Sequence, residues 1–296
     1  MELIYSTTEK NLKLPWFFYE TDNKELCCLF IHGLSASLVE NPFADVLGKY
    51  LQRNWIAFLY SQNSWYAHVN DIKTTKINKN KWYYTQRIWA VYERFSDCIY
   101  DIDSWITTIL QKWYKNIILI WHSSWCNKVL YYYHRKKIDN IIWIALLSAP
   151  DFVGLFKLEK YVPNYKELLE EAKEYVKQNN PQKILSTKIW DYHYLSAQTF
   201  LDLAVDESPA DNIPLLRNPD NFEELNNIQI PILAVYGEYD DIIIRSLEQD
   251  LDLIKQKCKS CMHFSKAVIP DAAHNYDLAP EKLAETIRDR ISRDIW

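Results

Sequence analysis

Three side chains that together could transfer an acyl group follow apolar segments of this chain. Ser123 follows the run NIILI and stands in the stretch IWHSSWC, while Asp240 and His274 end two later apolar runs. A histidine can take the proton of a serine, and a carboxylate can orient the imidazole and stabilise its charged form. The residue types and their order therefore indicate nucleophilic attack by serine on a carbonyl carbon.

Each of these side chains also has an ordinary structural explanation. A serine between a strand and a helix is often an N-cap, so Ser123 alone carries little weight. Asp240 and His274 strengthen the catalytic interpretation of Ser123, because each independently ends a predicted strand. Asp241 could replace Asp240, although the spacing from Gly237 favours Asp240.

The elements that must position these side chains are short apolar runs that alternate with helical segments. This alternation predicts an α/β fold with a mostly parallel sheet covered on both faces. The predicted parallel strands cover residues 26–31, 56–60, 116–120, 141–147, 232–236 and 266–269. An earlier pair, near residues 3–6 and 17–20, predicts an antiparallel edge.

Residues 151–228 interrupt the alternation. Asn164 and Glu167 resemble a capping box before a helical pattern, and the rest is polar and loop-like, with Pro209 and Pro214 as breakers. We therefore expect residues 1–150 and 229–296 to form the core domain and residues 151–228 a helical cap insertion. Such a cap would cover the carboxyl edge of the sheet, where open α/β sheets bind ligands.

Aromatic residues of the expected cap allow two interpretations. They could line an apolar acyl pocket, or they could pack a small helical layer onto the sheet. The residues concerned are Tyr161, Tyr165, Trp190, Tyr192 and Tyr194.

The turn His32-Gly33, then Ser123, Asp240 and His274, in that order, resemble the α/β-hydrolase superfamily, whose triad runs Ser, Asp, His along the chain. The resemblance extends from about residue 12 to residue 293 and is greatest to capped esterases of the serine-hydrolase type. It implies a mostly parallel sheet of the eight-stranded type with flanking helices. It also implies that Ser123 is the nucleophile, His274 the base and Asp240 the acid.

The same resemblance assigns supporting roles. Backbone N–H groups of Leu34 and Ser124 would form the oxyanion hole. The remaining residues of the motifs are His32, Gly33, His122, Trp121, Trp125 and Gly237. The implied reaction is hydrolysis of a carboxylic ester or thioester through an acyl-serine intermediate, without metal or organic cofactor. Amide hydrolysis, a lyase or an acyltransferase would fit the same fold, because a fold does not fix a function.

Trp121 and Trp125 conflict with this motif, because they flank the serine where the turn needs glycine. The chain has 4 glycines and 12 tryptophans, whereas ordinary usage of about 7% would give roughly 20 glycines. Two indoles in a strained turn would overpack it. Trp55 and Trp113 stand where the end of a helix calls for glycine, and the pairs Pro15-Trp16, Ser64-Trp65 and Ile88-Trp89 raise the same question.

We hypothesise that UGA codons explain this pattern. If the gene uses UGA for glycine and UGA is read as tryptophan, glycine positions become tryptophan, although some tryptophans, such as Trp105, would be genuine. The alternative accepts Trp121 and Trp125. The elbow would then be remodelled, and the protein would be a catalytically inactive hydrolase relative that binds a ligand or partner.

Composition narrows the possible partners. The net charge of −5 gives no electrostatic footprint for nucleic acid, and no apolar run is long enough to span a membrane. The N-terminus lacks the features of a signal peptide, so we expect a cytoplasmic protein with a small acyl ester as its substrate. Cys258 and Cys261 form a lone C-x-x-C without a second ligand pair, and we expect no metal there. Nothing in the sequence indicates the oligomeric state.

Overall fold

The computed structural model describes the whole chain except residues 35, 68, 76–83, 190–192, 217–221 and 296. Its strands are β1 (Glu2–Thr7), β2 (Lys13–Tyr19), β3 (Leu26–Ile31), β4 (Ala57–Ser61), β5 (Val69–Lys73), β6 (Thr85–Trp89), β7 (Asn116–His122), β8 (Ile141–Leu147), β9 (Ile232–Gly237) and β10 (Phe264–Ile269). Its α-helices are α1 (Pro42–Arg53), α2 (Cys98–Gln111), α3 (Trp125–Lys136), α4 (Phe152–Lys157), α5 (Tyr165–Lys177), α6 (Ala197–Ala204), α7 (Glu223–Asn226), α8 (Leu247–Lys257) and α9 (Pro280–Ile295). Two short 3₁₀ helices, η1 (Ala90–Tyr92) and η2 (Phe95–Asp97), precede α2.

Eight strands form one sheet in the order β1-β2-β4-β3-β7-β8-β9-β10. The pairs from β4 to β10 are parallel, and β2 pairs with β1 and β4 in the antiparallel sense. The predicted mostly parallel sheet with an antiparallel edge is therefore confirmed. Two of the predicted runs coincide with β3 and β8, and the bounds of the other four parallel strands differ by one or two residues.

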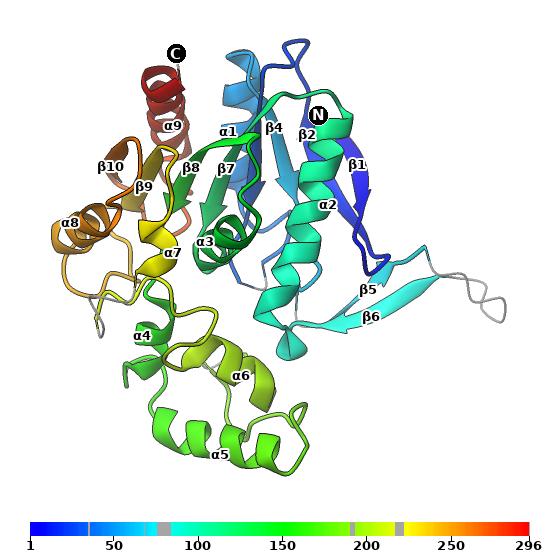
Figure 1. Cartoon of the computed structure of the whole chain (residues 1–296), viewed down its shortest axis with the longest axis vertical. Helices are drawn as coiled ribbons and strands as arrows, with labels where there is room; N and C mark the ends of the chain where they lie inside the picture. Colours follow the sequence, from blue (N-terminus) through cyan, green and yellow to red (C-terminus); the bar gives the residue numbers. More distant parts are fainter. Residues whose placement is uncertain (35, 68, 76–83, 190–192, 217–221, 296) are drawn as a thin grey trace.

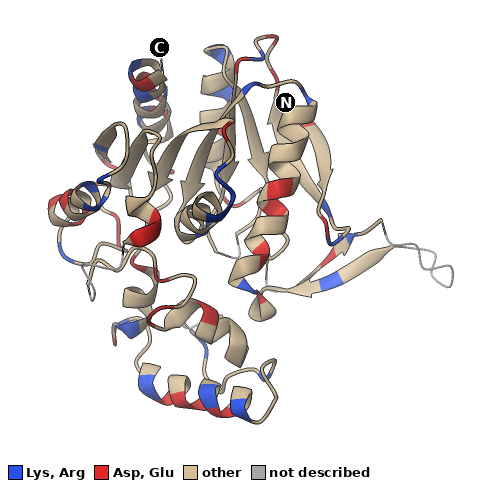
Figure 2. Cartoon of the chain, in the orientation of Figure 1, with Lys and Arg blue, Asp and Glu red and all other residues tan. Residues whose placement is uncertain are grey.

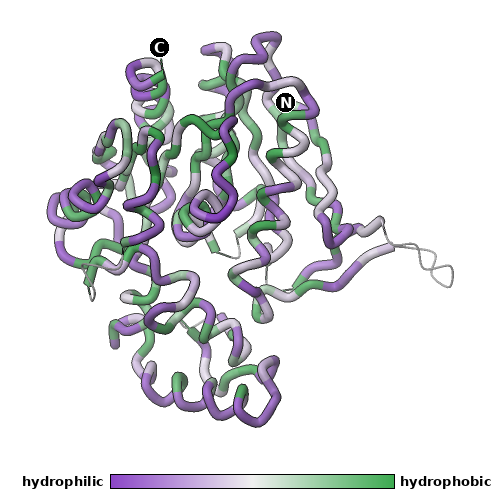
Figure 3. The backbone as a smooth tube through the Cα atoms, viewed as in Figure 1, coloured by the Kyte–Doolittle hydropathy of each residue, from purple (hydrophilic) through white to green (hydrophobic). Residues whose placement is uncertain are grey.

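Helices cover both faces of the sheet (Figure 1). Alternate side chains of one strand enter different cores, so that Leu119 of β7 packs with α2, α3 and α8 while Ile118 packs with α1 and α9. Hydrophobic residues follow the central strands, and hydrophilic residues dominate the outer helices (Figure 3). This double coverage explains why the parallel strands are apolar at successive positions.

The segment between β8 and β9 contains α4, α5, α6 and α7, so it is more helical than its polar composition suggested. Figure 1 shows α4, α5 and α6 gathered beyond one end of the sheet. Basic and acidic side chains alternate along α5, which is largely exposed (Figure 2). Asn164 is the N-cap of α5, but the expected capping box is absent: the Asn164 side chain makes no cap bond and donates instead to Thr187 Oγ1 (3.1 Å).

The antiparallel hairpin of β5 and β6 forms a separate two-stranded sheet that the sequence did not indicate. Each strand buries one side chain, Ile72 in β5 and Ile88 in β6. With so little burial, neither segment shows the apolar alternation by which strands are recognised.

Trp55 and Trp113 occupy left-handed backbone at the ends of α1 and α2, with φ of 62° and 69°. At both ends the tryptophan N–H donates to the carbonyl three residues back, and the next N–H donates to the carbonyl five residues back. These are the two bonds of a Schellman motif, whose left-handed position glycine or asparagine normally fills. Asn179 fills it after α5 with φ of 57°. The two indoles are largely exposed, 64% for Trp55 and 82% for Trp113, so little burial offsets the strain.

Replacing either tryptophan with glycine should therefore stabilise the protein. We expect Trp55→Gly and Trp113→Gly each to raise the free energy of unfolding by about 1 kcal/mol, because the left-handed conformation is costly for any residue with a Cβ. Urea denaturation followed by circular dichroism measures this change.

Two controls separate this effect from a general effect of glycine. Asn179→Gly should change stability little, because asparagine already tolerates left-handed backbone. Trp105→Gly, in the buried interior of α2, should lower the free energy of unfolding by about 4 kcal/mol. Destabilisation by Trp55→Gly and Trp113→Gly would contradict the interpretation of these helix ends.

Candidate active site

Ser123 stands on a sharp turn between β7 and α3. Its φ of 57° lies in the left-handed region, which is strained for a residue with a side chain. The Ser123 N–H donates to the Leu147 carbonyl (2.9 Å), which ties the turn to the end of β8. The predicted strand–turn–helix geometry is present, and α3 begins at Trp125.

The structure brings His274 and Asp240 to this serine. Ser123 Oγ lies 3.1 Å from His274 Nε2, and His274 Nδ1 lies 2.9 Å from Asp240 Oδ1. A carboxylate only accepts, so Nδ1–H is the donor and Nε2 is free to take the serine proton. The histidine side chain is 23% exposed and that of Asp240 is fully buried. Asp240, rather than Asp241, is thus the partner of His274.

Gly237 allows the loops that carry Asp240 and His274 to meet. A Cβ on Gly237 would lie 2.5 Å from the Ala272 carbonyl oxygen and 2.6 Å from that of Ala273. Any side chain there would push the loop of His274 away from β9. This close approach explains the glycine, whose proximity to Asp240 the sequence had already indicated.

Asp240 is held by groups that the sequence did not indicate. Ser148 Oγ donates to Asp240 Oδ2, and the hydroxyl of Tyr276 lies 2.7 Å from Ser148 Oγ. The N–H of Ile242 donates to Asp240 Oδ1 (3.3 Å). Burial opposes ionisation of Asp240, but its bond and attraction to His274, together with the donors Ser148 and Ile242, hold its pKa below the usual value.

Ser148 and Tyr276 are fully buried, and both have left-handed backbone, with φ of 51° and 55°. Ser148 directly follows β8, at the same sheet edge as Ser123, Asp240 and His274. That position is the one signal by which the sequence could have singled it out. Because Ser148 gives its only proton to Asp240, the one proton of the Tyr276 hydroxyl is shared between Ser148 Oγ (2.7 Å) and the Val235 carbonyl (3.0 Å).

Gly33 and Leu34 approach the serine from the end of β3. A Cβ on Gly33 would lie 3.0 Å from Ser123 Cβ, so glycine lets the backbone come close. Within the described part of the chain, the backbone N–H groups of Leu34 and Ser124 donate to no other group. They remain free to donate to a bound oxyanion.

Two neutral histidines support these turns. His32 Nδ1–H donates to the Gly33 carbonyl (3.1 Å), and its Nε2 accepts from Gln62 (3.0 Å). His122 Nε2–H donates to the carbonyl of His274 (2.9 Å). Burial lowers the pKa of His32 to about 4 and that of His122 to about 3, so both are uncharged at neutral pH. His122, which the sequence singled out only as a residue of the motif, therefore holds the loop of His274.

Trp121 and Trp125 do not disrupt the turn. Both indoles are buried and stack on each other, with centroids 5.4 Å apart, beside Trp105 of α2. The expected remodelling of the elbow does not occur, because the two rings occupy the core between the sheet and α2 instead of the space around Ser123. The arrangement has a cost, since the indole N–H groups of Trp121 and Trp105 are buried without a partner.

A cavity of about 370 Å³ opens beside Ser123. The core contributes Gly33, Leu34, Ala36, Asn41, His122, Pro150, Asp241, Ile242, His274 and Asn275, and the segment after β8 contributes Phe152, Leu155 and Tyr161. Tyr161 also donates from its hydroxyl to the Asp241 carbonyl (2.7 Å). The other aromatic residues differ: Tyr165 packs on Phe200, Tyr194 is 41% exposed, and Trp190 and Tyr192 lie outside the described residues.

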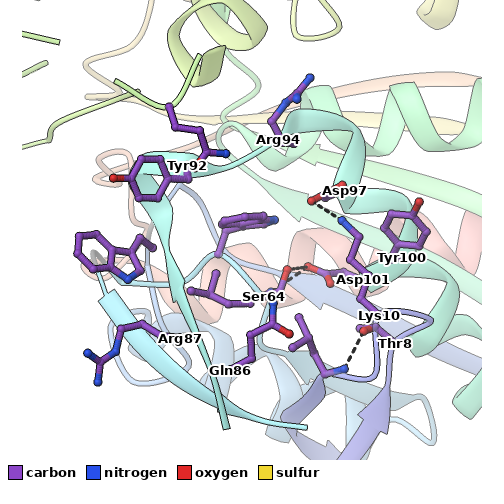
Figure 4. Close-up of a pocket in the computed structure, with 15 residues that line it drawn as sticks. Thr8, Lys10, Ser64, Gln86, Arg87, Tyr92, Arg94, Asp97, Tyr100 and Asp101 are labelled. Carbon is purple, nitrogen blue, oxygen red and sulfur yellow. Dashed lines mark hydrogen bonds and ion pairs between the residues drawn. The ribbon is translucent and has the colours of Figure 1, made fainter. Parts of the chain in front are cut away.

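A second cavity of about 270 Å³ lies against the β5–β6 hairpin and the start of α2 (Figure 4). Lys10 pairs with Asp97 (2.7 Å), and the buried carboxylate of Asp101 accepts from the N–H and hydroxyl of Ser64 (2.8 and 2.9 Å). Burial raises the pKa of Asp101 to about 7. These polar groups satisfy one another, and none of the described residues that line the cavity is a histidine.

Two further expectations concern metals and membranes. Among the described residues, the one group spaced to hold a metal ion is Asp240, Asp241 and His274, and two of these bond to each other. Cys258 and Cys261 are free thiols at the end of α8. Within the described ranges, every helix is too short or too polar to cross a bilayer.

Comparison with known proteins agrees with this fold. The model of the family described as "Protein of unknown function (DUF1749)" matches residues 96–296, and no curated protein matches the chain. Est1E from Butyrivibrio proteoclasticus is similar in structure, with a TM-score of 0.65 and 15% identity over 100% of this chain and 99% of that one. The siderophore hydrolase EstB from Aspergillus fumigatus has a TM-score of 0.70 and 13% identity over 99% of this chain and 98% of that one. The Pyrococcus furiosus esterase Pf2001 has a TM-score of 0.61 and 13% identity over 100% of this chain and 91% of that one. The chain therefore has the α/β-hydrolase fold and belongs to the DUF1749 family.

Proposed function

We propose that the protein is a serine hydrolase that cleaves a carboxylic ester or thioester. The main support for the proposal is the pair of hydrogen bonds that link Ser123 Oγ to His274 and His274 to Asp240. Ser123 and His274 both line a cavity. The esterases and hydrolases of similar structure support a hydrolase of this fold, although at their low identity they carry only the fold.

The reaction follows from these positions. His274 Nε2 takes the proton of Ser123 as Oγ attacks the carbonyl carbon, and the free N–H groups of Leu34 and Ser124 donate to the oxyanion. His274 then protonates the leaving alcohol or thiol and activates the water that releases the acyl group. Asp240 keeps the histidine in the required tautomer and stabilises its charged form.

Residues 151–228 act as the cap in this proposal. Phe152, Leu155 and Tyr161 line the cavity next to Ser123, so the segment would contribute part of the wall around the substrate. The bond from the Tyr161 hydroxyl to the Asp241 carbonyl joins this segment to the loop after β9. Apolar side chains with few polar groups suit an acyl or alkyl group.

The second candidate function is that of a catalytically inactive binding protein. It rests on authentic tryptophans at positions 121 and 125. Its support is reduced by the 3.1 Å contact between Ser123 Oγ and His274 Nε2, which exists with both indoles in place.

We infer that glycine replaces tryptophan at positions 55, 113, 121 and 125 when the cell makes this protein. Trp55 and Trp113 hold left-handed helix ends with exposed indoles. Trp121 and Trp125 bury stacked indoles in the core between the sheet and α2, where the Trp121 N–H has no partner. A UGA codon read as glycine accounts for all four. Trp143 differs, because its indole N–H donates to Asp294 (3.0 Å), and it should be a genuine tryptophan.

A fluorophosphonate probe tests the hydrolase directly. We expect it to label Ser123, because His274 activates this hydroxyl, and intact mass followed by peptide mapping measures the adduct. Ser123→Ala should abolish labelling. Ser124→Ala, which keeps its backbone N–H, should still be labelled at Ser123. If neither the chain as printed nor the Trp121→Gly/Trp125→Gly variant reacts, the protein is a binding protein.

Peptide masses from the native organism test the glycine positions. We expect glycine at 55, 113, 121 and 125 and tryptophan at 143, together with UGA codons at the first four positions of the gene. Tryptophan at 121 and 125 in the native protein would rule out recoding at the elbow.

Ser148→Ala tests the support of Asp240. Loss of the donor should lower kcat for an ester by about tenfold, because one charge-assisted hydrogen bond to a buried carboxylate is worth roughly 1.5–3 kcal/mol. KM should change little, since Ser148 does not line the cavity. The proton between His274 and Asp240, observed at low field by NMR, should shift in Ser148→Ala and less in Tyr276→Phe. An unchanged proton resonance and unchanged kcat would show that Ser148 has no positioning role.

A further inference from the structure

Among the described residues that line the cavity beside Ser123, one charged side chain lies outside the proposed mechanism. Its walls are mainly apolar, with Leu34, Phe152, Leu155 and Ile242 among them, and its other polar side chains include two neutral amides. No lysine or arginine lines it within the described part of the chain. The one charged side chain is that of Asp241, the residue after the proposed acid Asp240.

The carboxylate of Asp241 lies close to the reacting groups. One of its oxygens is within 4.8 Å of a ring nitrogen of His274 and of a carboxylate oxygen of Asp240. Its main chain is fixed, because the carbonyl accepts from Tyr161 (2.7 Å). No described lysine or arginine forms an ion pair with it. Among the described residues, no cation therefore compensates this exposed carboxylate at the wall of the cavity.

Two described cations, Lys160 and Arg245, do not line the cavity. Lys160 lies over the ring of Tyr161, with Nζ 4.4 Å from the ring centroid, but it is not among the lining residues. Arg245 is occupied by Asp250 (3.0 Å). A carboxylate or phosphate on the substrate would thus face Asp241 without a matching cation among the described residues, and like charges repel.

We propose that this site accepts esters whose acyl group is uncharged, and that Asp241 is a specificity-determining residue that rejects anionic acyl groups. The proposal rests on the hydrolase function above. It goes beyond that function because Ser123, His274 and Asp240 would hydrolyse an anionic ester equally well, so they do not determine the charge of the substrate. An ammonium group at the same place should be tolerated, because Asp241 would attract it.

Three para-nitrophenyl esters with six-carbon acyl chains test this selectivity. The hexanoate ends in a methyl group, the hydrogen adipate in a carboxylate and the ω-aminohexanoate in an ammonium group. We expect kcat/KM for the hexanoate to exceed that for the adipate by about tenfold or more at low ionic strength, with the ammonium ester in between or equal to the hexanoate. Added salt should narrow the difference. Spontaneous hydrolysis of each ester is subtracted.

Asp241→Asn isolates the charge. The hexanoate-to-adipate ratio should fall by about tenfold, and Asp241→Lys should bring it lower or invert it. The ratio is the readout, so a general loss of rate does not obscure the result. Asp22→Asn makes the same change of charge at an exposed position before β3, at the opposite edge of the sheet, and should leave the ratio unchanged.

The outcomes distinguish the two levels of the proposal. If no ester is hydrolysed and no fluorophosphonate adduct forms, the hydrolase function itself fails. If the esters are hydrolysed but the ratio is near one, or Asp241→Asn and Asp22→Asn change it equally, the role of Asp241 is wrong while the hydrolase function stands.

Discussion

Parallel pairing of β7, β8, β9 and β10 is the constraint on which the site depends. The register sets His122 opposite Leu147, Leu147 opposite Val235, and Ile269 opposite Gly237, so the carboxyl ends of the four strands lie at one edge. Residues separated by more than a hundred positions then emerge side by side. A shift of two residues in one pair would move a loop by about 7 Å, more than twice a hydrogen-bond length.

The polar groups at this edge depend on one another because they are buried. Asp240 is withdrawn from water, and an isolated carboxylate there would be costly. His274 and Ser148, with Tyr276 behind Ser148, supply the donors that keep it ionised. The same network fixes the orientation of the imidazole toward Ser123. The hydrogen bonds that keep the Asp240 carboxylate ionised therefore also align His274 with the proposed nucleophile.

The tryptophans show the difference between steric fit and conformational cost. Trp121 and Trp125 fit, since the core between the sheet and α2 accommodates both rings. Trp55 and Trp113 also fit, because their rings reach solvent. What remains is the cost of left-handed backbone at Trp55 and Trp113 and of the unpaired indole N–H of Trp121, neither of which appears as a clash. These costs, together with the scarcity of glycine, are the physical basis for inferring glycine at these positions.

Local sequence determined the strands and the candidate residues. The apolar runs 26–31 and 141–147 are β3 and β8, and Ser123, Asp240 and His274 each follow a strand, because side-chain pattern and turn residues act over a few positions. The tertiary structure alone brought Ser148 and Tyr276 to the Asp240 carboxylate and left the charge of Asp241 at the cavity wall. It also showed that the turn forms beside two buried indoles. These features depend on which distant residues the sheet register places within a few ångströms, and no local pattern encodes those distances.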